Sequence, residues 1–240
     1  MKLICYLSNG YPSIDASIRM ASEYVNAGCD IIEVDFPSHD PYLEGELIAG
    51  RMAEALRAND NYDDYMAGIL KIKAQHPNTR FIVLAYENTV MEIGVQKYAD
   101  FILNNGFGDI IYVGNQHPEV LRELIARGIH ASCYVQFHQP EDEVQAALSA
   151  NGFVYVQAKP TTGNVNPKTP TLKDCIRHLR ELGITREIYA GVGIYTTDDI
   201  AMARDAGADG VFVGSTILKL HDDLPKLRET IRALKSAAED

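Results

Sequence analysis

Short apolar runs rich in β-branched and aromatic residues recur at fairly even distances along the chain, and a longer stretch with helical periodicity follows each run. The pattern predicts eight βα units. The predicted strands span residues 2–7, 30–35, 80–85, 109–113, 130–135, 153–157, 187–191 and 210–213. The predicted helices span residues 14–26, 62–75, 91–104, 118–127, 140–150, 171–182, 196–206 and 222–238, with an extra helix at 45–58.

The predicted strands are continuously apolar, which is typical of a parallel sheet with both faces covered by helices. Six glycines lie between a helical pattern and the next strand, where a left-handed helix cap favours a residue without Cβ: Gly28, Gly106, Gly128, Gly152, Gly183 and Gly207. The 240 residues also suit one closed α/β barrel, which needs roughly 200–250. No linker or low-complexity segment divides them. The sequence therefore predicts one α/β domain over residues 1–240, a (β/α)8 or TIM barrel of eight parallel strands. An open doubly wound sheet with a second domain is the alternative.

Charge and composition exclude several classes of partner. The chain carries 22 Lys and Arg against 33 Asp and Glu, a net charge of −11. This excess repels nucleic acid and anionic membranes. The start, MKLICYLSNGYP, is too short in apolar residues for a signal peptide or a membrane span. The four cysteines show no CxxC spacing. We expect a cytoplasmic protein with reduced thiols.

Two glycine-rich loops follow the last two predicted strands. They are Gly191-Val192-Gly193 and Val213-Gly214-Ser215, and Gly163 follows the sixth strand. Backbone N–H groups exposed by glycine, with a short helix beginning at Ser215, form an anion-binding nest without a positive side chain. Barrels commonly bind phosphate at this place. The alternative is that the glycines only form tight turns. The pairing of the loops favours a phosphomonoester substrate bound by Gly163, Gly193, Gly214 and Ser215.

Glu33 lies inside the apolar run Ile31-Ile32-Glu33-Val34, near the carboxyl end of the second strand. Burial raises the pKa of a carboxyl group, which suits proton transfer near neutral pH. A buried glutamate that is only hydrogen-bonded is the alternative. Glu44 follows in the next loop, and taken alone it is typical of a solvated loop charge.

These residues resemble the tryptophan synthase α subunit family, which includes free-standing indole-3-glycerol-phosphate lyases. The resemblance covers nearly the whole chain and is strongest in AGCDIIEVDFPSHDPYLEG. It continues through Tyr86-Glu87-Asn88, through Tyr155 and Thr162-Gly163, and through GVGI and VGSTILK near the end.

The resemblance implies an enzyme of tryptophan biosynthesis, a lyase that cleaves indole-3-glycerol phosphate to indole and glyceraldehyde 3-phosphate by a retro-aldol reaction without a cofactor or metal. It implies that Glu33 is the general acid and base, that Glu44 polarises the indole N–H, and that Tyr155 shapes the site. Substrate contacts are expected from Tyr6, Tyr86, Tyr112 and Thr162.

The chain departs from the family pattern at several positions in the pocket. Glu44 replaces an Asp, Tyr6 a Phe, Tyr112 a Leu and Asn115 an Asp. Other departures are Tyr11, the segment Gln136-Phe137-His138, and loop six, AKPTTG, which is one residue short. The chain also begins directly at the first strand, without the helix that covers the barrel bottom in the family. These changes place larger or more polar side chains at several positions of the indole pocket.

Three other functions remain open from the sequence. Lys159 follows the sixth strand, where barrel aldolases carry a Schiff-base lysine. His39, His117 and His138 follow strands and, with Asp35 or Asp40, are candidates for a metal site. A barrel that binds a phosphorylated ligand without turnover is the third alternative.

The family's α subunit docks a pyridoxal-phosphate-dependent β subunit through the loop after the second strand. Pro37, Asp40 and Asn88 match that surface, whereas Ser38 and His39 replace a typical Phe-Ser. The resemblance therefore allows a β-subunit partner without requiring one.

Overall fold

The computed structural model describes residues 1–161 and 163–239. Its strands are β1 (Lys2–Leu7), β2 (Ile31–Asp35), β3 (Arg80–Tyr86), β4 (Asp109–Val113), β5 (His130–Ala131), β6 (Cys133–Val135), β7 (Val154–Gln157), β8 (Ile188–Gly191) and β9 (Gly210–Val213). Its helices are α1 (Ile14–Ala27), α2 (Glu46–Ala58), α3 (Tyr62–Gln75), α4 (Glu87–Ile93), α5 (Val95–Asn104), α6 (Pro118–Ala126), α7 (Glu141–Ser149), α8 (Leu172–Glu181), α9 (Thr197–Asp205), α10 (Ser215–Leu218) and α11 (Leu224–Glu239).

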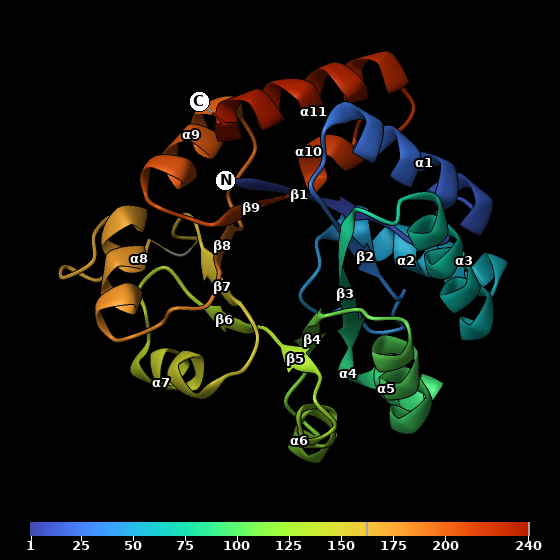
Figure 1. Cartoon of the computed structure of the whole chain (residues 1–240), viewed down its shortest axis with the longest axis horizontal. Coiled ribbons are helices and arrows are strands. Elements are labelled where there is room, and N and C mark those ends of the chain that lie inside the picture. Colours follow the sequence, from blue (N-terminus) through green and yellow to red (C-terminus); the bar gives the residue numbers. More distant parts are fainter. Residues whose placement is uncertain (162, 240) are drawn as a thin grey trace.

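All strand pairs are parallel, in the order β5-β4-β3-β2-β1-β9-β8-β7-β6. The two ends of this order, β5 and β6, are separated in the chain only by Ser132. The Ser132 N–H donates to Ile110 of β4 at 2.9 Å, and the Cys133 N–H donates to Phe153 before β7 at 3.1 Å. β5 and β6 are therefore one interrupted barrel strand. The predicted barrel is confirmed, with the helices around its outside (Figure 1).

Alternate strand residues pack into two separate cores, as the two-residue period of a strand requires. One face points outward to the helices and forms the larger core. The other fills the barrel interior with Ile4, Tyr6, Ile31, Ile82, Leu84, Tyr86, Ile111, Phe153, Tyr189 and Phe212. Phe153 and Tyr189 lie with ring centroids 4.8 Å apart. These rings fill the interior near the amino-terminal ends of the strands.

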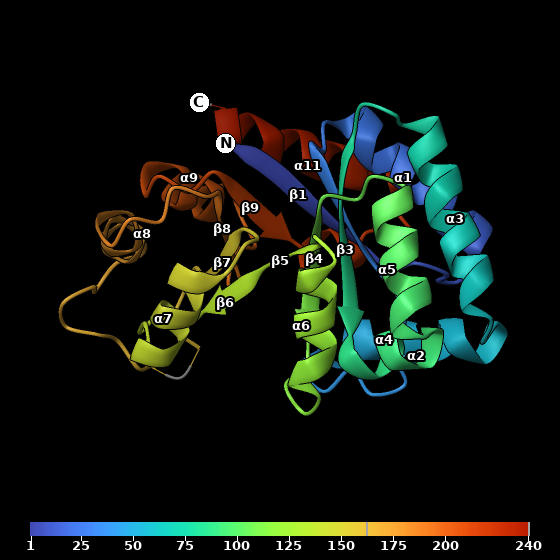
Figure 2. The same cartoon turned by 60° about the horizontal axis from the view of Figure 1, so that its bottom comes forward.

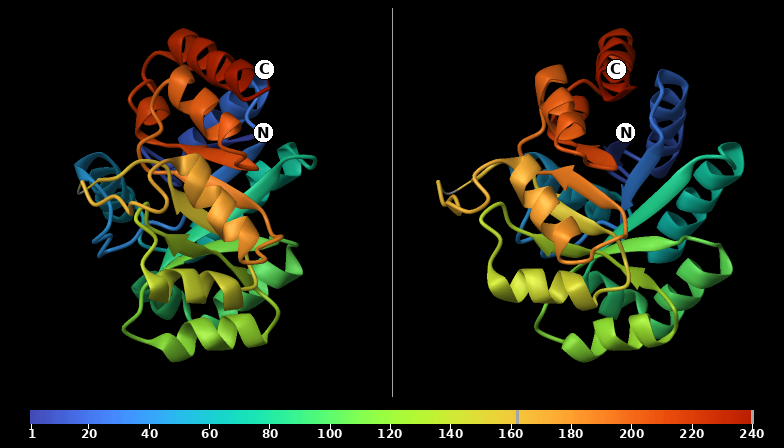
Figure 3. Two further views of the ribbon diagram at one scale, coloured as in Figure 1. Left: turned by 90° about the vertical axis from the view of Figure 1, so that its left-hand side faces the viewer. Right: turned by 60° about the vertical axis from the view of Figure 1, so that its left-hand side comes forward.

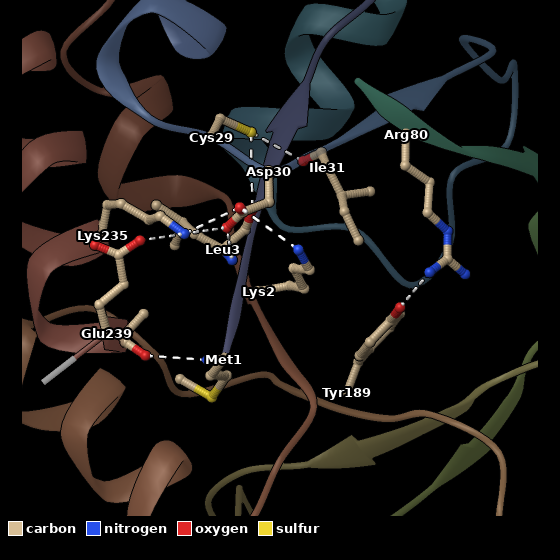
Figure 4. A network of polar contacts seen from close by, with 11 residues as sticks. Met1, Lys2, Leu3, Cys29, Asp30, Ile31, Arg80, Tyr189, Lys235 and Glu239 are labelled. Atoms are coloured by element: carbon tan, nitrogen blue, oxygen red, sulfur yellow. Dashed lines mark hydrogen bonds and ion pairs between the residues drawn. The ribbon is translucent and has the colours of Figure 1, made fainter. Parts of the chain in front are cut away.

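Polar contacts connect the amino-terminal ends of the strands. Arg80 donates to Asp109 at 2.5 Å, to Glu187 at 2.6 Å and to the Tyr189 hydroxyl at 2.8 Å, so it joins β3, β4 and β8. The contact with Tyr189 is visible in Figure 4.

Asp30, just before β2, connects the first strand to the last helix (Figure 4). It accepts hydrogen bonds from the Leu3 N–H and from Lys235 of α11, each at 2.8 Å. The amino group of Met1 donates to the Ala238 carbonyl at 3.2 Å. α11 also packs beside α1, and Figure 3 shows the red and blue helices next to each other.

Two sequence predictions were wrong in detail. The helix expected over 91–104 is two helices, α4 and α5, because Gly94 between them has φ of 94°. Gly152 does not adopt a left-handed cap. Glycine is needed there because an added Cβ would lie 2.3 Å from the Ala131 carbonyl oxygen.

No helix within the described ranges is both long enough and apolar enough to cross a lipid bilayer.

Candidate active site

A cavity of about 880 Å³ opens at the carboxyl ends of the strands, where barrel enzymes carry their sites. In Figure 2 this is the end toward which β3 points, beside α2 and α4. The cavity is lined by nine of the residues predicted from the sequence: Tyr6, Glu33, Glu44, Tyr86, Tyr112, Tyr155, Gly193, Gly214 and Ser215. Gly163 is exposed and does not line the cavity. Thr162 lies outside the described residues.

Glu33 projects into the barrel interior from β2. It lies two residues after Ile31 of the interior core and therefore on the same face of the strand. It lies opposite Tyr6 in the register of β1 and β2. Its side chain is 6% exposed and has no hydrogen-bond partner among the described residues. Burial, with the nearby Glu44 and Asp35 carboxylates, raises the pKa of Glu33 well above its ordinary value. Burial therefore favours the protonated form of the Glu33 carboxyl.

Glu44 reaches the cavity from the loop before α2. Its Oε1 accepts a hydrogen bond from the Tyr86 hydroxyl at 3.2 Å, and the Tyr42 ring packs edge-on against Tyr86 at 5.5 Å. Partial burial raises the pKa of Glu44, although the Tyr86 hydrogen bond lowers it. Glu44 is therefore a held carboxyl in the cavity wall and not a free loop charge.

Tyr155 of β7 is held by two neighbouring strands. Its ring stacks on Phe212 of β9 with centroids 4.4 Å apart and an interplanar angle of 11°. The phenol lies against Gly191 of β8, where an added Cβ would be 2.2 Å from Tyr155 Oη. Burial and the Glu33 carboxylate raise the pKa of Tyr155 well above its ordinary value, so the phenol stays protonated.

Asp35 is a buried carboxyl beside the cavity that the sequence analysis considered only as a possible metal ligand. It lies two residues after Glu33 on the same face of β2 and is 0% exposed. It accepts hydrogen bonds from the Tyr6 hydroxyl at 2.5 Å and from the Asn9 N–H at 2.6 Å. Burial raises the pKa of Asp35 to about 7, against the effect of these two bonds. The two-residue spacing from Glu33 was the signal that could have found it.

A fourth carboxyl, that of Glu87, organises the wall at β4. It accepts hydrogen bonds from the Tyr112 hydroxyl at 2.9 Å and from the His117 N–H at 3.1 Å. It is buried beneath Gly114, where an added Cβ would lie 2.3 Å from the Glu87 Cβ. Tyr112 is thereby fixed with its ring along the cavity. The wall also includes four residues that were not predicted to bind the substrate: Asn115, Ser132, Tyr134 and Gln157.

The glycine-rich loops meet at one side of the cavity. Gly193 has φ of 100°, which a side chain rarely adopts, and Gly214 directly precedes α10. Ser215 begins that helix, and the exposed Lys219 at its end also lines the cavity. The arrangement offers backbone N–H groups and one cation to an anionic group.

Lys159 does not line the cavity and is held by an ion pair. Its ammonium group contacts the Asp199 carboxylate in the first turn of α9, and its side-chain stem lies against Gly193. Desolvation opposes the ionisation of Asp199, but the Lys159 hydrogen bond and backbone donors leave its pKa below the ordinary value. A Schiff base requires a free amine, whereas the Lys159 amine contacts the Asp199 carboxylate.

The three histidines of the metal hypothesis lie apart from one another. His39 is 3.9 Å from Glu92, and His117 is 3.2 Å from Glu119. Within residues 1–161 and 163–239, no three His, Cys, Asp or Glu side chains gather in a way that could hold a metal ion.

The fold and the site together define a (β/α)8 barrel whose cavity, at the carboxyl ends of the strands, holds a buried carboxyl and two glycine-rich loops. The chain belongs to the tryptophan synthase alpha chain family, whose model matches residues 1–239. It is 27% identical to the tryptophan synthase alpha chain of Methanosarcina barkeri over 237 residues, covering 97% of this chain and 88% of that protein. It is 31% identical to the Mycobacterium leprae protein over 234 residues, covering 94% and 84%.

A solved structure agrees with this assignment. The crystal structure of tryptophan synthase from M. tuberculosis in its aminoacrylate-bound form superposes with a TM-score of 0.82 at 26% identity, covering 99% of this chain and 93% of that one.

Proposed function

We propose that the chain cleaves indole-3-glycerol phosphate to indole and glyceraldehyde 3-phosphate in this cavity. Members of the family are lyases that catalyse this reaction. The observation that carries the assignment of the residues is the burial of Glu33, with its pKa raised well above the ordinary value, in the wall of a cavity that also holds Glu44.

The reaction needs one proton delivered and one removed. Protonated Glu33 donates its proton to the indole C3, while the Glu44 carboxylate takes the proton from the indole N–H, which gives the indolenine tautomer, and holds it until the nitrogen takes it back. Glu33, now ionised, then removes the proton from the hydroxyl next to C3. The bond between C3 and the glycerol carbon breaks, the aldehyde C=O forms, and the electron pair returns to the ring, whose nitrogen regains its proton. One carboxyl group can therefore serve both steps.

The remaining residues bind and orient the substrate. Gly193, Gly214 and Ser215 bind the phosphate through backbone N–H groups and a hydroxyl. Tyr155, stacked on Phe212, forms a fixed wall beside Glu33. Tyr86 holds Glu44, and Tyr112 lines the wall at β4.

Replacing Glu33 by Gln tests this proposal. The amide cannot transfer the proton, so we expect a loss of about 10²–10⁴-fold in indole release, the usual contribution of a general acid or base. Binding of inorganic phosphate should be unchanged because the phosphate loops lie on other strands. Glu54→Gln, an exposed position on α2, is the control. Unimpaired indole release by Glu33→Gln would exclude Glu33 from the chemistry.

We also propose that the rim of the cavity docks a pyridoxal-phosphate-dependent β subunit. Tyr42, Leu43 and Tyr195 are 56%, 70% and 55% exposed around the opening, and apolar side chains gathered on a surface are typical of an interface. We expect the two subunits to co-elute in size-exclusion chromatography. Leu43→Asp should weaken this co-elution. A chain that neither co-elutes with a β subunit nor is activated by one would contradict this proposal.

A cytoplasmic location is proposed from the thiols. All four cysteines are free, and three of them are buried, which suits a reducing compartment. Recovery of the native protein outside the cytoplasmic fraction would contradict this location.

A further inference from the structure

Tyr6 lies between the two functional ends of the cavity. β1 is flanked by β2 and β9 in the sheet, and Tyr6 pairs in register with Glu33. On the other side, a Cβ added to Gly214 would lie 3.6 Å from the Tyr6 Cβ. A substrate with its reacting carbon at Glu33 and its phosphate at Gly214 must therefore pass over Tyr6.

The Tyr6 hydroxyl is fixed in one orientation. It donates to Asp35 Oδ2 at 2.5 Å, and Asp35 Oδ1 is held in turn by the Asn9 N–H at 2.6 Å. The Tyr24 hydroxyl holds the backbone of the same residue through the Tyr6 carbonyl at 3.1 Å. Since the phenolic proton points to Asp35, the oxygen lone pairs are left for a donor in the cavity.

We propose that the Tyr6 hydroxyl, positioned by Asp35, accepts a hydrogen bond from an alcohol group on the carbon chain that joins the reacting carbon to the phosphate. Tyr6 is thus a specificity residue and Asp35 a positioning residue. The inference rests on the proposed function, because that function places a hydroxylated three-carbon phosphate in this part of the cavity.

The protonation of Asp35 sets the direction of this hydrogen bond. Burial raises the pKa of Asp35 to about 7. Below that pH, protonated Asp35 donates to the Tyr6 oxygen and frees the phenolic proton, which can then serve a carbonyl group. Above it, Tyr6 only accepts, and an alcohol is preferred. Three other titratable groups act on this pair, namely Glu33 on β2, Glu44 on the following loop and Tyr65 on α3.

The test compares sn-glycerol 3-phosphate, which has an alcohol at its central carbon, with dihydroxyacetone phosphate, which has a carbonyl there. Dissociation constants are measured by calorimetry at pH 6 and pH 8, and their ratio cancels effects on the shared phosphate. One hydrogen bond corresponds to roughly tenfold in affinity. We expect the preference for the alcohol to increase by about that factor from pH 6 to pH 8.

Two variants assign the effect to Tyr6 and Asp35. Tyr6→Phe should abolish the preference at both pH values while leaving inorganic phosphate affinity unchanged. Asp35→Asn should make the preference independent of pH, because the amide does not titrate. Tyr62→Phe on α3 is the matched control, because the Tyr62 hydroxyl also donates to a carboxylate, that of Glu92 at 3.0 Å, but the residue does not line the cavity; this variant should keep the wild-type ratio and its pH dependence. Circular dichroism confirms that each variant is folded.

The same ratio in wild type and Tyr6→Phe would overturn the inference, as would an unchanged pH dependence in Asp35→Asn. These results are separate from turnover. If wild type releases indole but the ratio does not depend on Tyr6, this inference fails and the proposed function stands. If wild type releases no indole but Tyr6→Phe abolishes the preference for the alcohol, the proposed function fails and this inference stands.

Discussion

Tyr155 occupies its place in the site only because the neighbouring strand carries glycine. Gly191 leaves room for the phenol, and a methyl group there would lie 2.2 Å from Tyr155 Oη and 2.4 Å from Cε2. Neither the ring nor the strand can absorb such a contact without moving, since Phe212 stacks on the ring.

Gly191→Ala is therefore expected to displace Tyr155 and reduce indole release by about a hundredfold, the usual effect of a misplacement near 1 Å. Steady-state kinetics measure the loss. Gly50→Ala, whose added methyl group meets no atom within 4 Å, should keep wild-type activity. Full activity of Gly191→Ala would show that Tyr155 does not shape the site.

Glu33 carries a cost in stability that its removal should reveal. A carboxyl whose pKa is raised in the folded state favours the fold below its unfolded pKa near 4, and this contribution is lost as pH rises through the folded value. Glu33→Gln should therefore melt at a higher temperature than wild type, and its advantage should grow from pH 5 to pH 8, to about 1–3 kcal/mol. A constant difference across this pH range would contradict the raised pKa.

For single residues, the sequence predicts a functional side chain where one residue interrupts a strong pattern. Glu33 is recognisable because a carboxyl interrupts an apolar strand. Asp35 lies two residues further along the same strand, but an acid at the end of a strand is also common in a loop, and its hydrogen bond from Tyr6 shows what it contacts. Gly191 was assigned to a glycine-rich turn, whereas its contact with Tyr155 depends on strand register and could not be predicted.

Among the elements, α2 and α10 are joined by a buried arginine. Arg51 of α2 donates to the Leu218 carbonyl of α10 at 2.7 Å and to His221 Nδ1 at 2.9 Å. Because Arg51 donates to Nδ1, the proton of His221 lies on Nε2, which donates to the Tyr24 hydroxyl at 2.6 Å. Burial and the Arg51 charge lower the pKa of His221 to about 4, so the ring stays neutral. The helix after Glu44 is thus fixed to the helix that begins at Ser215.

Arg51→Met should release this connection. The Leu218 carbonyl and the His221 ring would lose their partner, and we expect a loss of about 1–3 kcal/mol in stability together with a raised KM. Thermal unfolding and steady-state kinetics measure the two effects. Arg57→Met, at an exposed position on the same helix, is the matched control. An unchanged KM in Arg51→Met would show that α10 is positioned without it.

Element boundaries were predictable where periodicity was unambiguous. Eight strands and most helices follow from the alternation of apolar runs and helical patterns. The division into α4 and α5 was not predicted, because the residues on both sides of Gly94 keep a helical pattern and only its φ of 94° separates them. The break of the fifth strand at Ser132 likewise arises from closure of the barrel.

For the whole molecule, Arg80 connects strands that are far apart in the chain. Its three partners belong to β4 and to the region of β8, so it restrains the barrel at the end opposite the cavity. Arg80→Met should lower stability by about 1–3 kcal/mol, which for a chain of this size is roughly 2–4 °C per kcal/mol. Arg177→Met removes an exposed ion pair with Asp174 within α8 and should change the stability little. An equal loss of stability in Arg80→Met and Arg177→Met would contradict this role of Arg80.

The net charge of −11 is compatible with an anionic substrate because the proposed phosphate contacts come mainly from backbone N–H groups. Such a site binds one phosphate group through neighbouring N–H groups, whereas the overall charge governs association with large polyanions. Composition could therefore predict which partners the surface repels, but it could not predict the phosphate site. That prediction required the glycine loops and their place in the barrel.

Indole release from indole-3-glycerol phosphate by the purified chain, measured side by side for wild type and Glu33→Gln, tests the central claim most directly. We predict that wild type releases indole and that Glu33→Gln is slower by about 10²–10⁴-fold while it still binds phosphate. A folded wild-type chain that releases no indole alone or with a β subunit, or a variant as fast as wild type, would contradict it.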